Sequence, residues 1–227
     1  MTTEKAVDND YRSRQKRTGD QLRQETRHRL LEAAAAEFAA NGYAASTVTR
    51  IAEGAGVSVQ TLYLAWGSKR ALLRAYMERA LAGIASSPAQ DAERFTSDMP
   101  PEERLAELAA LVTDIAGRAA LGWTLYRDAA AIDPEIADDW NELQNLRHQR
   151  FARIVDEIPD EALAAGLCSA TAIDTAWVLA SPETFDLLTR RLGYTLDDFH
   201  AWLVRALTSS LLAASSTRSA TPRDPAD

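Results

Sequence analysis

The chain has 227 residues, of which 46% are hydrophobic and only 7% aromatic, and alanine is abundant, so we expect one or two helical domains with real cores. The net charge is −8, but residues 1–80 contain 13 Lys/Arg and 9 Asp/Glu (+4), whereas the remainder contains 12 and 24 (−12). A mildly basic head on an acidic body fits a nucleic-acid-binding module, and ordinary surface variation is the alternative. The single cysteine (Cys168), the polar N-terminus and the lack of a long apolar run predict a cytoplasmic protein without a disulfide, signal peptide or membrane span.

Residues 1–22 are polar and have no apolar periodicity, so we expect a disordered arm. A small basic cluster lies within it: Arg12, Arg14, Lys16 and Arg17. We interpret the arm as a solvated tail, and the alternative is an arm that follows a phosphate backbone or enters a minor groove. A helix is then predicted from Gln24 to Ala40, ending at Asn41-Gly42, where glycine can adopt the left-handed conformation.

Two short helix patterns follow between Val48 and Ala65, on either side of one turn. The first pattern places Val48, Ile51, Ala52 and Ala55 on one helix face, with Ser46 or Thr47 as its N-cap. Gly56 lies at the bend, where a positive φ is needed, and the second helix starts at Ser58. This order predicts a helix-turn-helix, although any two-helix hairpin in a helical core can have it.

After Trp66-Gly67, Ser68 is expected to cap a fourth helix. Its buried side is predicted to contain Leu72, Leu73, Tyr76, Met77, Ala80, Leu81 and Ile84. Residues 86–101 include three prolines and are predicted to form a linker.

The rest of the chain is predicted to be helical, with breaks that begin at Pro, Gly or capping residues. We expect helices over 102–120, 123–132, from Pro134 past Ile154, over 170–179, from Pro182 to Gly193 and from Thr195 past Leu211. Asp133-Pro134-Glu135 is a helix start, and Thr195 with Asp198 resembles a capping box. Residues 215–227 are expected to be a disordered tail.

Residues 26–77 resemble the DNA-binding domain of the TetR family of transcriptional regulators. The residues that carry the resemblance are Leu30, Leu31, Ala34, Phe38, Gly42, Tyr43, Thr47, Val48, Ile51, Ala52, Ala55 to Ser58, Thr61 to Tyr63, Trp66, Ser68, Lys69, Leu72 and Leu73. The family implies an all-α fold of about nine to ten helices, in which a three-helix head (residues 23–85) is followed by a larger helical bundle (residues 102–214). Residues from Trp177 to Trp202 are similar, more loosely, to the family's C-terminal sensor domain, which implies that the last helices pair in a homodimer.

The resemblance also implies DNA contacts. Thr47 is expected to donate to a phosphate, and Tyr63 and Lys69 to hold the backbone on either side of the groove. Ala65 departs from the pattern, since a polar residue often contacts phosphate there, and Arg50 is the candidate to compensate. On the second helix, Gln60 is the predicted base reader, because its amide can pair with adenine, and the alternative is a solvated side chain. Ser58, Val59 and Thr61 complete the predicted contacts.

A ligand pocket is predicted within the bundle, from large side chains on helices that should enclose one interior. Its expected lining is Leu108, Trp123, Tyr126, Trp140, Arg147, Phe151 and Trp177. Plain core packing is the preferred interpretation of each aromatic residue. Arg147 shares an apolar helix face and needs an anionic partner; we favour an internal ion pair with Asp114, Asp128 or Asp174 over the anionic group of a ligand.

The sequence lacks the residue patterns typical of enzymes. The three histidines are far apart in the sequence, and neither a metal-ligand spacing nor a phosphate-binding glycine loop is present. Cys168 is taken as a small loop residue, and the alternative is a redox-sensing thiol. We therefore expect a non-enzymatic repressor without a cofactor or membrane contact. It would bind a pseudo-palindromic double-stranded operator as a homodimer and be released by a small, mainly apolar molecule. The alternatives are an activator, a ligand-independent DNA binder, or a helical enzyme that keeps the head as a relic.

Overall fold

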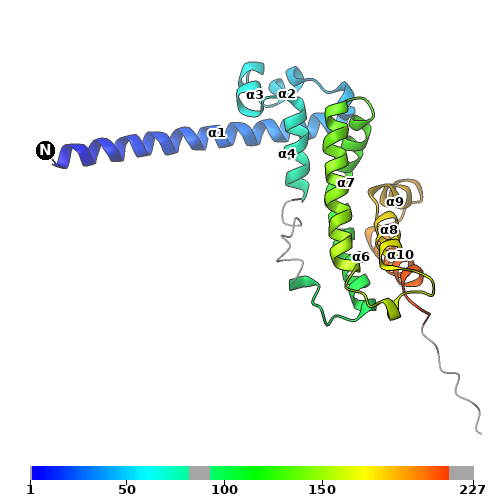
Figure 1. Ribbon diagram of the computed structural model, residues 1–227. Helices are drawn as coiled ribbons and strands as arrows, with labels where there is room; N and C mark the ends of the chain where they lie inside the picture. The colour runs from blue at the N-terminus through cyan, green and yellow to red at the C-terminus, as the bar shows by residue number, and fades with distance from the viewer. Residues whose placement is uncertain (1, 82–92, 215–227) are drawn as a thin grey trace, which may run out of the picture. The chain divides into compact units, whose positions relative to one another are not determined.

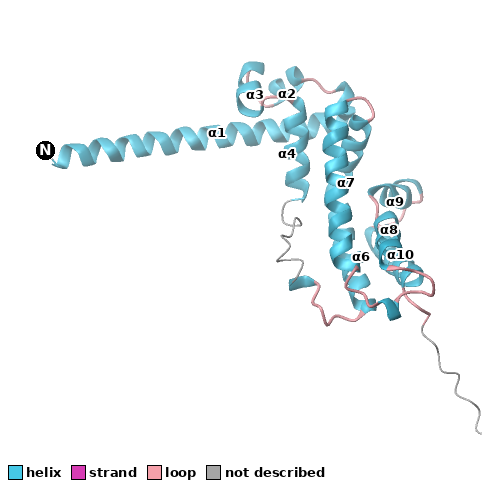
Figure 2. Ribbon diagram, in the orientation of Figure 1, coloured by secondary structure: helices cyan, strands magenta, loops and turns pink. Residues whose placement is uncertain are grey.

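The computed structural model describes residues 2–81 and 93–214, with side chains from residue 19 onward, and the described part contains helices and loops but no strand (Figure 2). The all-α prediction is therefore confirmed. The chain packs as two compact units: residues 1–85 with 118–143 form the first, and residues 86–117 with 144–227 form the second. The first unit thus contains the expected head and also residues that we assigned to the following bundle.

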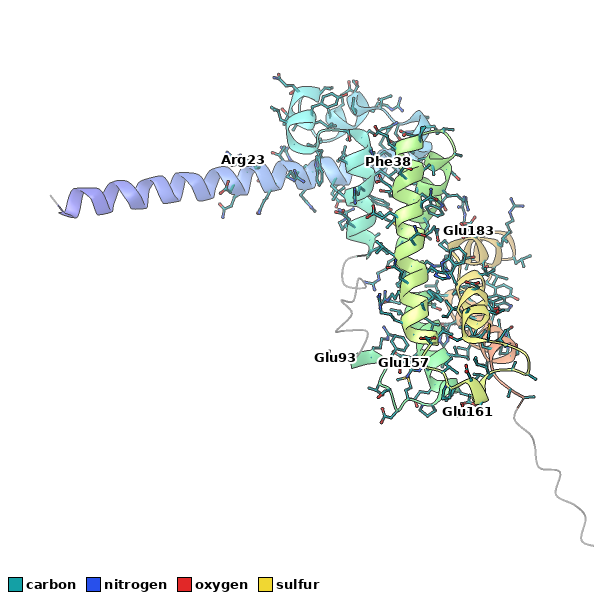
Figure 3. The ribbon with its side chains drawn as sticks, in the orientation of Figure 1. Arg23, Phe38, Glu93, Glu157, Glu161 and Glu183 are labelled. Atoms are coloured by element: carbon teal, nitrogen blue, oxygen red, sulfur yellow. The ribbon has the colours of Figure 1, made fainter. Side chains whose placement is uncertain are left out.

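The head consists of four helices: α1 (Thr2–Ala45), α2 (Val48–Gly54), α3 (Val59–Trp66) and α4 (Lys69–Leu81) (Figure 1). Helix α1 packs against α2, α3 and α4. Their shared core consists of fully buried apolar side chains: Leu30, Ala34, Phe38, Ile51, Leu62, Leu72 and Leu73. Figure 3 shows Phe38 among these helices. Arg23 lies nearer the N-terminus of α1, before the part of the helix that the other head helices cover. Burial of these residues is the main stabilisation of such short helices, because isolated helices of this length are marginal in water.

The N-terminus differs from its prediction. Helix α1 begins at Thr2, whereas a disordered arm was expected over residues 1–22 and a helix only from Gln24. The segment has no proline, and its three Arg, two Lys and two Gln residues favour helix through their backbone propensity. Apolar periodicity detects a buried face and not helix formation itself, so it gave no signal here. The side chains of Arg12, Arg14, Lys16 and Arg17 lie outside the described residues.

Gly42 interrupts the helical backbone of α1 with φ 68° and ψ 174°. The predicted break is confirmed, but the conformation is extended in ψ and not the left-handed helical one that we expected. This combination is open almost only to glycine. The chain then turns through Ser46, which is buried and whose hydroxyl donates to the Gly42 carbonyl at 2.6 Å.

Helix α6 (Pro101–Ala130) is continuous where two helices were expected over 102–120 and 123–132. Gly122 is not a break. A Cβ there would lie 2.7 Å from Met77 Sδ, so the glycine allows α4 and α6 to approach closely within the first unit. By length and apolar composition alone, α6 is also long enough to cross a membrane. Half of an apolar 18-residue stretch of the helix is buried within the protein. Ile84 and residues 86–92 of the expected linker lie outside the described residues.

Helix α7 (Pro134–Val155) starts as predicted, because Asp133 Oδ1 accepts from the amides of Glu135 and Ile136 at 3.0 and 3.4 Å. The remaining elements belong to the second unit: η1 (Asp160–Ala162), α8 (Ser169–Leu179), α9 (Pro182–Asp186), the π-helical turn η2 (Leu187–Arg191) and α10 (Leu196–Leu211). Thr195 and Asp198 form the predicted capping box of α10. The described part contains nine α-helices besides η1 and η2, which agrees with the nine to ten expected, although α6 is one helix where two were expected. Residues 215–227, the expected tail, lie outside it.

Candidate nucleic-acid interface

The turn between α2 and α3 is a Schellman motif. The Val57 amide donates to Ala52 O and the Gly56 amide to Glu53 O, both at 3.0 Å, and Gly56 has φ 65°. These bonds satisfy carbonyls at the C-terminal end of α2 that the helix itself leaves unpaired. The two helices are therefore joined by a turn of fixed geometry, and the prediction that Gly56 requires a positive φ is confirmed.

Helix α3 has one buried anchor and an exposed outer surface. Leu62 is 0% exposed, whereas Tyr63 is 50% and Leu64 82% exposed. Ser58 caps the helix, since its Oγ accepts from the Thr61 amide at 3.1 Å, and the two hydroxyls are 2.9 Å apart. Gln60 is exposed in the first turn, while Val59 and Thr61 are half-buried. The predicted base-reading residues are thus together on the first turn, at a helix end where the backbone carries partial positive charge.

Thr47 caps α2 by accepting from the Arg50 amide at 3.2 Å, so of the two predicted caps the structure uses Thr47. The Arg50 side chain pairs with Glu37, Nε to Oε1 at 2.6 Å, and also donates to the Ala45 carbonyl. Glu37 is largely buried, and Arg50 remains about half-exposed. Arg50 therefore fastens α2 to α1 and has only part of its guanidinium free for another partner.

Lys69 is anchored inside the head. Its Nζ donates to the carbonyls of Tyr43 and Ser46 at 2.8 and 2.9 Å and lies 4.1 Å from the centroid of the Tyr43 ring. Desolvation lowers the pKa of Lys69 below its ordinary value, and burial, followed by the nearby Asp133, raises the pKa of Tyr43 to about 12. Two of the three ammonium donors are thus committed to stabilising the chain between α1 and α2.

Arg27 takes a position at the end of α3 that the sequence analysis missed. It is exposed, its guanidinium donates to the Ala65 carbonyl, and it lies 3.8 Å from the centroid of the Trp66 ring. The Trp66 indole donates back to Arg27 O at 3.3 Å. Arg27 and Ala65 are 38 residues apart, so no local pattern relates them. The cation beside the unusual Ala65 is therefore Arg27 and not Arg50.

Helix α4 is joined to α7 by ionic contacts that we call the α4–α7 clamp: Arg70, Arg74, Glu135 and Asp139. Arg70 binds both oxygens of Asp139, at 2.7 and 2.8 Å, and Glu135 at 2.6 Å. Asp139 is only 6% exposed, and the hydrogen bond from Arg70 lowers the pKa of its carboxyl below the ordinary value. Bidentate pairs of this kind fix relative orientation as well as distance. The head is therefore tied to α7 one residue after α4 begins.

Three of the predicted ligand residues, Trp123, Tyr126 and Trp140, belong to the first unit. The rings of Trp123 and Trp140 meet edge to face with their centroids 5.7 Å apart. Tyr126 is 1% exposed, and burial strongly raises the pKa of its hydroxyl. These contacts are those of a packed core, which was the preferred interpretation.

The other four, Leu108, Arg147, Phe151 and Trp177, belong to the second unit. The Arg147 guanidinium lies 5.0 Å from the ring centroids of both Phe151 and Trp177, and it donates to the Trp177 carbonyl and to Gln144. Desolvation lowers the pKa of Arg147 to about 10, opposed by attraction to Glu183.

The favoured ion pair of Arg147 is absent from the described residues. Asp128 pairs with Arg127 at 3.2 Å and Asp174 with His148 at 2.8 Å, while the hydrogen bonds of Arg147 go to Gln144 and to the Trp177 carbonyl. Arg147 instead donates to the Trp177 carbonyl in the last turn of α8, where a cation interacts favourably with the helix dipole. The prediction of an internal acid partner for Arg147 is corrected accordingly.

Comparison with known proteins identifies the head. Residues 30–76 match the family model described as bacterial regulatory proteins, tetR family. This match covers the DNA-binding head of the chain. Among its relatives is the HTH-type transcriptional regulator BetI 2 of Chromohalobacter salexigens, which is 29% identical over 186 residues, covering 76% of this chain and 86% of that protein.

Solved TetR-type structures share the fold. NalD, described as the secondary repressor of the MexAB-OprM multidrug efflux pump in Pseudomonas aeruginosa, has a TM-score of 0.63 at 20% identity, covering 84% of this chain and 98% of NalD. A TetR-like transcriptional regulator from Rhodococcus sp. RHA1 has a TM-score of 0.56 at 16% identity, covering 80% and 93%. The head is thus similar to the DNA-binding domain of TetR-family transcriptional regulators, and the chain shares the fold of solved TetR-type structures.

Proposed function

We propose that the protein is a ligand-responsive repressor that binds a pseudo-palindromic DNA operator as a homodimer in the cytoplasm. The observation that carries this proposal is the exposed first turn of α3, which presents Ser58 and Gln60 while Leu62 fixes the helix to the core. Such a helix fits the major groove, and two copies about 34–36 Å apart read successive grooves. An activator or a ligand-independent DNA binder has the same head, so the effect of an effector distinguishes them.

The DNA contacts that we propose divide into two groups. Gln60 reads a base, with Val59 and Thr61 available to a thymine methyl, and Thr47, Tyr63 and the third ammonium donor of Lys69 position the head on phosphates. Arg27 replaces the phosphate contact expected before the aromatic residue, since it lies at Ala65 and is exposed.

Two substitutions distinguish these roles. Gln60→Ala is expected to lose about 1–3 kcal/mol of discrimination at one base pair, because an amide pairs with two atoms of one base. Arg27→Ala is expected to weaken binding to all duplexes and to reduce the slope of log K against log salt by about 1. Selection from a randomised duplex library and a salt titration measure both effects. An unchanged base preference for Gln60→Ala would refute its reading role.

For homodimerisation we propose four exposed apolar side chains on the last elements of the second unit: Val178, Leu187, Leu192 and Leu196. These side chains are 54%, 55%, 67% and 47% exposed in the single chain. Exposed apolar groups of this kind are typical of protein interfaces. The supporting contacts below them are apolar too, since Phe185 packs on Phe199 with ring centroids 4.9 Å apart.

Leu187→Glu is expected to shift the protein to monomer and to lower operator affinity at least tenfold, because a buried unpaired carboxylate is unfavourable. Leu146→Glu is the matched control: Leu146 is 56% exposed, on α7 and outside these elements. Sedimentation equilibrium measures the oligomeric state of both. Monomer formation by the control alone would place the interface elsewhere.

Release from DNA would act through α7. This helix supplies Glu135 and Asp139 to the clamp and, further along, Arg147 and Phe151 to the predicted ligand contacts. An effector that binds one conformation of α7 a few kcal/mol more tightly than the other is sufficient to shift the population of heads competent for DNA.

A further inference from the structure

Arg104 is a buried cation without an anionic partner. It lies in the first turn of α6 and is 1% exposed; Leu105, next to it in sequence, and Leu108, one turn further along the helix, are 0% and 1% exposed. Arginine is almost never buried to this extent unless it is paired.

Most of its hydrogen-bond donors are unsatisfied. Nη2 donates to the Thr96 carbonyl at 2.5 Å, whereas Nε and Nη1, which carry three N–H bonds, are buried without an acceptor. The acid one turn further along α6, Glu107, pairs with Arg94 instead. Glu102 and Glu103 are exposed, and no carboxylate of the described residues is within ion-pair distance of Arg104.

A neutral acceptor or a water molecule could satisfy some of these donors but would leave the charge uncompensated in an apolar setting. An anion satisfies the free donors and also compensates the charge, because carboxylate and phosphate oxygens accept from several guanidinium donors at once. The N-terminal end of α6 adds to this preference, since the helix dipole favours negative charge within the first turn.

We propose that Arg104 binds the anionic group, carboxylate or phosphate, of a ligand whose remaining body is apolar. The apolar body follows from the neighbours of Arg104 on α6, and Leu108 is one of the predicted ligand contacts. This inference rests on the proposed ligand response and sharpens it: the effector is an amphipathic anion rather than a neutral apolar molecule.

The test is thermal unfolding of the full chain without DNA. Wild type and Arg104→Met are each titrated with inorganic phosphate, octanoate and, as the neutral counterpart of octanoate, octanol. Without probe, Arg104→Met is expected to unfold at the same or a higher temperature, because methionine fills a similar volume without a buried charge. Octanoate or phosphate is expected to raise the midpoint of the wild type, and the apparent Kd is expected to rise at least tenfold in Arg104→Met. Octanol is expected to change the unfolding midpoints of wild type and Arg104→Met by the same amount.

Arg94→Met is the matched control, because it removes the same charge from a half-exposed ion pair close to Arg104 in sequence. It is expected to keep the response to the anionic probe. Should Arg104→Met fail to fold, Arg104→Lys keeps the charge but loses the planar fork, and it is expected to bind the anionic probe more weakly than wild type.

An equal response of wild type and the Arg104 variants, or no response of the wild type to either anion, would overturn the proposal. A stronger response to octanoate than to phosphate identifies a carboxylate ligand, and the reverse identifies a phosphate. Failure of the proposed DNA function would be seen separately, as absence of operator binding by the wild type, on which these midpoints do not depend.

Discussion

Leu62→Ala is expected to lower the free energy of unfolding of the head by about 2–5 kcal/mol. Leu62 is 0% exposed and is the one residue of α3 that is buried, so its truncation leaves a cavity between α3 and the helices beneath it. Since α3 is only eight residues long, Leu62 is the single buried side chain through which it packs on the head. DNA affinity should therefore fall together with stability. Urea unfolding followed by circular dichroism, with operator binding on the same preparation, measures both.

Leu64→Ala provides the control, because it removes the same atoms from the same helix two residues away, where the side chain is 82% exposed. Its effect on stability should be within about 0.5 kcal/mol. Equal effects of the two substitutions would mean that α3 is not held as the structure places it.

The second large effect concerns the α4–α7 clamp. Asp139→Asn is expected to lower the free energy of unfolding by about 2 kcal/mol, the size of hydrogen bonds to charged groups. The hydrogen bond from Arg70 lowers the pKa of Asp139, so the folded state holds the ionised form more strongly than the unfolded state does. The advantage of wild type over Asp139→Asn is thus fully present above the unfolded pKa of about 4 and is lost as the pH falls through the lower folded value.

Unfolding of the two proteins between pH 7 and pH 2.5 measures this difference. Asp138→Asn is the control, since Asp138 is the exposed neighbour of Asp139 on α7. A stability difference for Asp139→Asn that stays constant at acid pH would exclude the ionised pair as its cause. Under the proposed ligand response, the same substitution should also weaken the effect of an effector on DNA binding, because it loosens the contact between α4 and α7.

The sequence predicted best where one residue type has one physical role. Gly56 had to take a positive φ, Thr195 and Asp198 had to cap a helix, and Asp133-Pro134 had to start one; the structure confirms all three. Helix α3, which begins after Ser58, was likewise predicted from the sequence, because capping and apolar spacing act within a few residues.

Predictions failed where the deciding partner is distant in sequence. Two helices were expected over 102–120 and 123–132, but α6 runs through Gly122, which allows the close approach of Met77, 45 positions away. The partners of Arg27 and Arg70 lie 38 and 69 residues further along the chain, and the position of Lys69 under Tyr43 depends on the same tertiary packing. For Arg147, the apolar face indicated burial correctly, but it gave no information on which group would accept its hydrogen bonds.

The most direct test of the central claim is binding of the purified full chain to the DNA upstream of its own coding region, compared with a scrambled duplex over a salt series. We expect saturable binding with two chains per site, at least 1,000-fold tighter than to the scrambled duplex at physiological salt, with log K falling linearly with log salt. Equal affinity for both duplexes, or no binding at low salt, would contradict the account.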